Sequence, residues 1–399
     1  MSDAFFDSIC KLVEKNDTII LFKEKYMLMK PFLVSLNIKD VNLYDKWLES
    51  EIKKYSDCKV ESHIPYISRS MARDTEVLGA VDNVEIILEW LNNIPQPEQR
   101  TPAWYVYRSS VLTASSLSHI FDKSTSVSYL DYFESKVTQN SKMIRGNALS
   151  HGIRHEQNAQ SIYEIINNCT VSEYGCIKHK EIDYIGASPD GIVTKAADPK
   201  MLGRMLEIKC LFSRRLTGIP KWNYWVQCQL QMEVCNLPIC DFFECVINEK
   251  NTMTDFYNKI RNNTMDNKYY GIVIEYEFVD NPDNIKYIYS PIGSDEDTLM
   301  NWYDSETDQF DNSDKQFIRA FYWTLTKYSS TTIKRDKEWF SMISPNIKLF
   351  WDNVCDARKK IKENPASAET ILKLENRPVK KIRKKLLNIE NNDVCICDD

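Results

Sequence analysis

Several features that mark membrane or secreted proteins are missing from this chain of 399 residues. No apolar run is long enough to span a bilayer, because Lys23, Glu24 and Lys25 interrupt the best one after Phe22. The first residues, MSDAFFDS, are acidic and lack the character of a signal peptide. The twelve cysteines show no paired spacings in the first half of the chain, which disfavours a disulfide framework. These absences predict a soluble, reduced, intracellular protein whose cysteines are mostly small core residues.

An excess of basic charge, the usual mark of a nucleic-acid-binding protein, is also missing. The formal net charge is −6, so any surface that holds DNA must be local. A hydrophobic content of 43% is enough for a large core, and the length predicts two or three domains. The most basic stretch lies at residues 373–385, and it is interpreted either as extra phosphate contacts or as a solvated end.

Composition along the chain divides it into four parts. Residues 3–93 show amphipathic helical patterns and no catalytic motif, and the polar, proline-rich run at 94–102 predicts a stiff linker after them. We predict an N-terminal helical accessory domain at 1–95, a core at 100–250, a C-terminal α/β extension at 251–365 and a charged tail at 366–399.

Hydrophobic periodicity predicts helices and strands in mixed order. Helices are expected at 104–108, from Thr113 or Ser115 through Phe121, and at 129–137, 148–167 and 224–235. Strands are expected at 170–177, 184–187, 192–193, 205–210 and 240–247. In the extension we expect strands at 270–278 and 285–289 around a turn at 281–284, a solvated acidic loop at 294–314 and a helix at 345–362. This order predicts an α/β fold with a mixed sheet.

The strongest chemical pattern lies in GASPDGIVTKAADPKMLGRMLEIKC, residues 186–210. Asp190 occupies a Ser-Pro-Asp-Gly turn, which is followed by a short apolar strand. Side chains alternate along the strand at 205–210, so Glu207 and Lys209 project from one face while apolar residues occupy the other.

A hairpin that closes between Val193 and Met205 would bring Asp190 next to Glu207. Two adjacent carboxylates attract a hard cation such as Mg²⁺, and the ammonium of Lys209 suits a phosphate or an attacking water. An acid, a gap and Glu-x-Lys are the core pattern of a metal-dependent nuclease. The structural alternative is a surface turn beside a half-exposed edge strand.

Four blocks in the same order resemble the lambda-exonuclease or YqaJ-type viral recombinase branch of the PD-(D/E)XK nucleases. They are AWYVYRSSVLTASSLSHIF at 103–121, ALSHGIRHEQNAQSIYE at 148–164, the GASPDGIV and LEIKC segments, and VQCQLQMEV at 226–234. The resemblance implies a restriction-endonuclease-like core whose central mixed sheet is flanked by helices. The flanking domains and the long Asp190–Glu207 insert depart from the smallest members, and the chain is more similar to large DNA-virus versions.

The resemblance implies a catalytic set of five side chains, Glu156, Asp190, Glu207, Lys209 and Gln227. Asp190, Glu207 and the Ile208 backbone carbonyl would hold Mg²⁺, with Mn²⁺ as a substitute. Glu156 would complete the site directly or through water. Lys209 would orient or activate the water that attacks phosphorus.

The resemblance also implies a pocket for a terminal 5′-phosphate, made by Arg108, Ser115 and Ser188. Arginine suits this role because its planar guanidinium binds phosphate oxygens in a bidentate way. The alternative for Arg108 is a surface salt bridge.

Two further DNA contacts follow from the same resemblance. Arg215 would contact the DNA backbone, with Arg214 as the alternative in register. Gln229 lies two residues from Gln227 and cannot share its helix face, so it is either a DNA contact or a structural residue.

His151 and His155 lie one helical turn apart, a spacing that suits zinc. The order of residues does not match His-Glu-x-x-His, and no third ligand of suitable spacing is evident in the sequence. Zinc is therefore disfavoured.

These patterns predict a Mg²⁺-dependent 5′→3′ double-strand DNA exonuclease for recombination, repair or genome processing in a DNA virus. The rivals are a structure-selective or nonspecific endonuclease on the same core and a non-catalytic DNA-binding module. The expected partners are double-stranded DNA ends and a single-strand annealing protein, with no membrane. For the oligomeric state, a monomer and a ring-shaped homotrimer are both compatible with the sequence. For the location within the infected cell, the nucleus and a cytoplasmic virus factory are both compatible.

Overall fold

The computed structural model describes residues 84–121, 127–139, 146–311 and 313–365, together with residues 368, 371 and 372. These residues belong to one of two units of the chain, spanning residues 60–373. Most of the predicted N-terminal helical domain and the tail after residue 372 lie outside the described residues.

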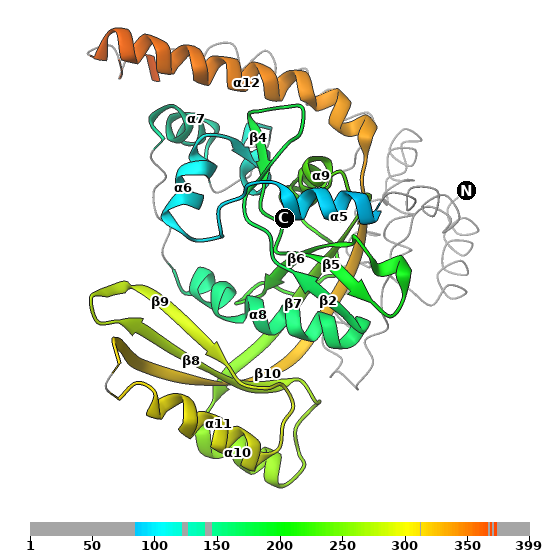
Figure 1. Ribbon diagram of the computed structural model, residues 1–399, viewed down its shortest axis with the longest axis vertical. Helices are drawn as coiled ribbons and strands as arrows, with labels where there is room; N and C mark the ends of the chain where they lie inside the picture. The colour runs from blue at the N-terminus through cyan, green and yellow to red at the C-terminus, as the bar shows by residue number, and fades with distance from the viewer. Residues whose placement is uncertain are drawn as a thin grey trace, which may run out of the picture. The chain divides into compact units, whose positions relative to one another are not determined.

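A mixed sheet of seven strands forms the centre (Figure 1). Its order is β2 (Cys169–Ser172), β5 (Gly191–Ala196), β6 (Met205–Cys210), β7 (Ile239–Asn251), β10 (Lys315–Lys334), β8 (Tyr270–Phe278) and β9 (Asn281–Tyr289). Strands β6 and β7 run parallel, and all other neighbours in this sheet run antiparallel. The mixed sheet flanked by helices confirms the predicted fold class.

Helices and a small second sheet surround the centre. The helices are α5 (Val84–Asn93), α6 (Pro102–Ser109), η2 (Ala114–Ile120), α7 (Tyr129–Thr138), α8 (Asn147–Asn167), η3 (Pro199–Met201), α9 (Trp222–Cys235), α10 (Met253–Arg261), α11 (Glu296–Asp308) and α12 (Lys337–Glu363). The second sheet has the order β1 (Leu112–Thr113), β4 (Ile185–Ala187) and β3 (Ile177–Lys178). None of the described helices is both long and apolar enough to cross a membrane.

Helices α8 and α9 cover opposite faces of the central sheet. The ring of Tyr163 on α8 lies 5.4 Å from that of Phe243, and the ring of Tyr224 on α9 lies 5.6 Å from that of Phe242. Consecutive strand residues point to opposite faces, so these two contacts place the helices on different sides. Leu206 belongs to the core cluster on the α8 side, and the residues that alternate with it therefore face α9.

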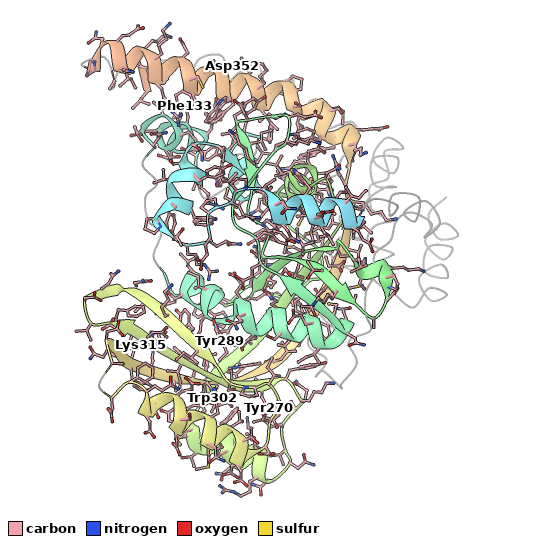
Figure 2. All side chains as sticks on the ribbon, viewed as in Figure 1. Phe133, Tyr270, Tyr289, Trp302, Lys315 and Asp352 are labelled. Atoms are coloured by element: carbon pink, nitrogen blue, oxygen red, sulfur yellow. The ribbon has the colours of Figure 1, made fainter. Side chains whose placement is uncertain are left out.

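The C-terminal extension contributes to the same sheet. Strand β10 pairs with β7 on one side and with β8 on the other, which joins the extension and the core in one sheet. Figure 1 shows β8, β9, α10 and α11 gathered at one end of the sheet. Helix α12 lies along α7, where the ring of Phe350 is 5.9 Å from that of Phe133, which is labelled in Figure 2.

The acidic stretch predicted as a loop at 294–314 instead contains helix α11, so that prediction was wrong. Asp295 caps the helix by accepting the Thr298 N–H at 2.8 Å, and the acids of the first turn favour the positive end of the helix dipole. Leu299 is fully buried in a cluster with Phe256 of α10. Trp302 and Tyr303 of α11 pack against the same cluster, so the helix has an apolar face that its acidic composition concealed.

Two strand predictions also needed correction. The run predicted at 170–177 divides into β2, in the seven-stranded sheet, and β3, in the small sheet. The turn predicted at 281–284 lies at residues 279–280, and β9 begins at Asn281. Since β9 is an edge strand, it tolerates a proline that would break a central strand.

The proline-rich segment after α5 is packed against the core. The Gln96 side chain accepts the Gly175 N–H at 2.7 Å. The Gln99 amide donates to the Tyr174 carbonyl at 2.8 Å and to the Pro189 carbonyl at 3.0 Å. These bonds fix the segment beside the turn that contains Asp190.

Replacing Gly175 with alanine should loosen this segment. An alanine Cβ would lie 2.0 Å from the Pro97 carbonyl oxygen, so one of the two backbones must move. We expect a loss of stability of about 1–3 kcal/mol, measured by urea unfolding. The control is Gly152→Ala on α8, where no atom lies within 4 Å of the added methyl and helix propensity favours alanine. Equal stability of the two variants would contradict the packing described here.

Candidate active site

The hairpin of β5 and β6 sets Asp190 beside Glu207. Gly191 pairs with Leu206, so the residue before β5 lies level with the residue after Leu206. Asp190 Oδ2 accepts the Ile208 N–H at 2.7 Å, which fixes the carboxyl against β6. The long insert between the two strands therefore leaves the two acids adjacent, as the sequence predicted.

Glu207 is fully buried and surrounded by donors. Gln227 Nε2 lies 2.7 Å from Oε1, Gln231 Nε2 lies 2.6 Å from Oε2, and Lys209 Nζ contacts Oε1. A buried carboxylate requires such partners, because its loss of hydration is otherwise very costly. Burial disfavours the Lys209 ammonium, but Glu207 and Asp190 outweigh that effect and raise the Lys209 pKa, so this side chain stays protonated.

The three glutamines of α9 divide into two roles. Gln231, which the sequence analysis missed, lies one helical turn after Gln227 and binds the same carboxylate. The signal was the four-residue spacing within QCQLQ. Gln229 instead donates to the Lys334 carbonyl at 2.7 Å and accepts the Asp336 N–H at 2.7 Å. We therefore assign Gln229 to the β10–α12 junction rather than to DNA.

Glu156 reaches the site from α8 and is paired with a residue that the sequence analysis did not single out. Arg100 Nη2 lies 2.7 Å from Oε1 of Glu156 and 2.6 Å from its Oε2. Burial is the largest effect on the Glu156 carboxyl and raises its pKa, although Arg100 and Lys209 act in the opposite direction. The Glu207 carboxylate raises it further.

The three acids lie close enough to act on one another electrostatically. Burial raises the Asp190 pKa well above its ordinary value, and the nearby Glu207 and Glu156 carboxylates raise it further. A divalent cation would relieve this repulsion, and carboxylate oxygens are the ligands that Mg²⁺ prefers. The carboxylates of Asp190, Glu207 and Glu156 are chemically suited to the implied metal, and their role as its ligands stays a prediction. The role of the Ile208 carbonyl stays a prediction, since the structure shows only its N–H bound to Asp190.

The three residues predicted for the phosphate pocket lie together. Arg108 donates to Ser115 Oγ at 2.9 Å and to Ser188 Oγ at 3.3 Å. The Arg108 guanidinium lies 4.2 Å from the centre of the Trp104 ring, whose N–H donates to Ser188 at 3.1 Å. Ser188 precedes Asp190 by two residues, so the pocket and the acids share one turn.

A buried lysine binds the main chain next to the phosphate pocket. Lys136 Nζ donates to the Arg108 carbonyl at 3.0 Å and to the Val111 carbonyl at 2.7 Å. From α12, Arg358 Nε donates to the Lys136 carbonyl at 3.1 Å. Burial, with the added repulsion of Arg108 and Arg358, lowers the pKa of Lys136 to about 7. These contacts fix the main chain that carries Arg108.

Lys136→Met should flatten the rise of stability with pH above neutrality. The Lys136 pKa is about 7 in the folded protein against 10.5 for an ordinary lysine. Between these values the unfolded chain binds more protons, so this group makes folding more favourable as pH rises from about 7 to 10.5. The substitution should lower the slope of the unfolding free energy against pH by up to about 1.4 kcal/mol per pH unit. Urea unfolding of both proteins across this range measures it, and equal slopes would contradict the burial of a titrating Lys136.

The two arginines after β6 have different surroundings. Arg214 Nη2 lies 2.6 Å from Oε1 of the fully buried Glu244. Arg215 is exposed. Because Arg214 already balances a buried carboxylate, Arg215 is the better of the two for a contact with the DNA backbone, which stays a prediction.

His151 and His155 lie close to Glu249 of β7. Glu249 is the third potential metal ligand, which the sequence did not reveal. The potential ligand atoms of these three residues all lie within 4.8 Å of one another. However, Arg154 donates to the same Glu249 oxygen at 2.7 Å, and this fixed positive charge opposes a metal ion. Although burial acts to raise the Glu249 pKa, the neighbouring His151 and His155 and the Arg154 charge lower it. We interpret the group as a buried ion-pair network.

The mixed sheet, with Asp190 just before β5 and Glu207-x-Lys209 on β6, resembles the arrangement of the PD-(D/E)XK class. Residues 103–238 match the model of the YqaJ-like viral recombinase domain. This segment contains the four sequence blocks, so the match confirms the resemblance that they predicted.

Among curated proteins the chain is similar to uncharacterized protein R354 of Acanthamoeba polyphaga mimivirus. The two are 30% identical over 297 residues, which cover 67% of this chain and 54% of the relative. The chain thus spans about half the length of this curated relative.

Solved exonuclease structures superpose on part of the chain. The alkaline exonuclease LHK-Exo of Laribacter hongkongensis, also solved with dAMP, has a TM-score of 0.41 and 20% identity. The match covers 67% of this chain and 99% of that one. A phage-related exonuclease of Haemophilus somnus 129PT has a TM-score of 0.33 and 10% identity, with 63% and 96% covered.

Proposed function

We propose that this protein is a Mg²⁺-dependent 5′→3′ double-strand DNA exonuclease. The observation that carries the proposal is the shared turn at Ser188–Asp190. On one side of this turn Arg108 and Ser115 form a pocket suited to a phosphate. On the other side Asp190 lies beside Glu207, whose carboxylate contacts the protonated Lys209. A nuclease that digests from a 5′ end needs both elements next to each other.

Each side chain has a role in this proposal. Arg108, Ser115 and Ser188 bind the terminal 5′-phosphate, and Trp104 packs behind the guanidinium. Asp190, Glu207, Glu156 and the Ile208 carbonyl hold the metal, which lowers the pKa of water and offsets charge on the phosphate. Lys209 orients the attacking water and stabilises the charge that develops on the phosphate oxygens.

Glutamines complete the site without touching the DNA. Gln227 and Gln231 hold both oxygens of Glu207 in place, so that its carboxylate is oriented before a cation arrives.

Arg215 contacts the backbone of the strand being digested. The expected products are 5′-mononucleotides and a 3′ single strand.

The biological setting is part of the proposal. The match of residues 103–238 to the viral recombinase domain and the similarity to a mimivirus protein support a role in recombination, repair or genome processing of viral DNA within an infected cell. Residues 100–365 would form the nuclease unit, with 1–95 as an accessory domain and 366–399 as a charged tail. A single-strand annealing protein is the proposed partner, and both a monomer and a ring-shaped homotrimer remain compatible with it.

Digestion of matched DNA forms tests the reaction class. The purified protein is incubated with Mg²⁺ and either a linear 5′-phosphorylated duplex or the same sequence as a covalently closed circle. We expect rapid loss of the linear form and no change in the circle. Nicking or linearisation of the circle would favour the rival endonuclease. Absence of degradation of both forms with Mg²⁺ or Mn²⁺ from neutral to alkaline pH would favour the other rival, a non-catalytic DNA-binding module.

A further inference from the structure

Arg100 engages an acid that the proposed metal site needs. Its Nη2 bonds to both carboxylate oxygens of Glu156, at 2.7 and 2.6 Å, so a cation that binds Glu156 must compete with this guanidinium. The Arg100 side chain is 42% exposed and that of Glu156 is 30% exposed. Ion pairs this accessible to water contribute little stability, so little free energy is lost when the guanidinium leaves Glu156.

The main chain at Arg100 is held on both sides, which leaves the side chain as the part that can move. Its φ is +64°, a left-handed conformation uncommon for arginine. Just before it, Gln99 donates to the Pro189 carbonyl, next to Asp190. Just after it, Thr101 caps α6 by accepting the Trp104 N–H at 3.3 Å.

The surroundings of Arg100 connect the two halves of the site. Helix α6, which Thr101 begins, carries Arg108 of the phosphate pocket. Asp190 and Glu156 both attract the Arg100 guanidinium and raise its pKa against the opposing effect of burial. Tyr289 of β9, labelled in Figure 2, lies near both charges: burial and the Glu156 carboxylate raise the pKa of its hydroxyl, and Arg100 acts to lower it. The Arg100 guanidinium therefore lies in contact with one of the acids and within electrostatic reach of another.

We propose that Arg100 is a phosphate-binding residue that rests on Glu156 until a divalent cation takes that carboxylate. The released guanidinium then binds a phosphate of the DNA strand between the pocket and the acids. This inference rests on the proposed exonuclease function and names a further substrate contact within it. A planar guanidinium suits both partners, because carboxylate and phosphate oxygens accept its N–H groups in similar geometry.

A metal titration without DNA tests the first half of the proposal. Calorimetry with Mn²⁺ at mildly alkaline pH compares wild type with Arg100→Gln. Because the competing charge is removed, the variant should bind Mn²⁺ about two- to fivefold more tightly. Arg261→Gln is the matched control, since it breaks another exposed arginine–glutamate pair, with Glu296. Its Mn²⁺ affinity should equal that of wild type. Equal or weaker Mn²⁺ binding by Arg100→Gln would make Arg100 a positioning residue for Glu156 and overturn the proposal.

DNA binding tests the second half. With Ca²⁺ in place of Mg²⁺, Arg100→Gln should bind a 5′-phosphorylated duplex about tenfold more weakly than wild type. The slope of log affinity against log salt should also fall by about one, as expected for one lost phosphate contact. Arg100→Lys should retain part of the affinity. Unchanged DNA affinity and salt slope in Arg100→Gln would overturn the proposal.

The outcomes separate this inference from the function on which it rests. If wild type fails to degrade DNA while both titrations behave as expected, only the exonuclease function is overturned. If wild type degrades DNA and either titration fails, only the role of Arg100 is overturned. If neither wild type nor Arg100→Gln binds Mn²⁺, both are overturned.

Discussion

Asp190→Asn and Lys209→Ala should each lower the rate of Mg²⁺-dependent DNA degradation by about 10³-fold or more. Asparagine keeps an oxygen that can accept the Ile208 N–H, so the first variant removes the negative charge while preserving the hairpin. The second variant removes the only ammonium that contacts Glu207 among the described residues. The rate is measured as release of acid-soluble nucleotide from a linear 5′-phosphorylated duplex.

The same hairpin provides matched controls for these variants. Asp198 and Lys200 lie in the insert between β5 and β6, and both are exposed. Asp198→Asn and Lys200→Ala should therefore degrade DNA at the rate of wild type. Thermal unfolding of all four variants separates lost chemistry from lost fold. Wild-type activity in either Asp190→Asn or Lys209→Ala would contradict the site assignment.

Arg108→Gln should remove the preference for 5′-phosphorylated ends. Wild type should degrade a 5′-phosphorylated duplex much faster than a 5′-hydroxyl duplex, because Arg108 and two serines form the only pocket proposed to bind that phosphate. The variant should lose about 10- to 100-fold on the phosphorylated substrate, which corresponds to one strong charged hydrogen-bonded contact. Its rate on the hydroxyl substrate should change little.

Comparison of rates on the two substrates measures this preference directly. Arg319→Gln is the control, since Arg319 is an exposed arginine that pairs with Glu275 at 3.1 Å, outside the proposed pocket. It should keep the wild-type ratio. A ratio that Arg108→Gln leaves unchanged would remove the phosphate pocket from the account and favour the structural alternative, a salt bridge or hydrogen-bonded support.

Much of the acidic site was predictable from the sequence because it depends on local geometry. Alternation along β6 was enough to place Glu207 and Lys209 on one face, and the Pro-Asp-Gly turn before β5 was enough to bring Asp190 to them. The grouping of Arg108 with Ser115 and Ser188 came from the family resemblance instead. No local rule connects a helix at 102–109 with a turn at 188–190.

The residues that escaped prediction depend on contacts between distant segments. Arg100 lies in a proline-rich run whose sequence indicates only a linker, and its pairing with Glu156 spans 56 positions. Glu249 completes the histidine group from a strand 94 positions away. Helix α11 was concealed because acidic residues dominate its composition, while the burial of Leu299 depends on α10. Gln231 is different, since its helical spacing from Gln227 was visible in the sequence.

We propose above all that the site around Ser188 and Asp190 binds a 5′-phosphorylated end and hydrolyses the adjacent phosphodiester bond with a divalent cation. The most direct measurement follows a linear duplex with one label on its 5′-terminal phosphate and another at its 3′ end. With Mg²⁺ we expect the 5′ label to leave first, as a mononucleotide, and we expect EDTA to prevent its release. Release of the 3′ label first, or appearance of the 5′ label in long fragments, would contradict the account.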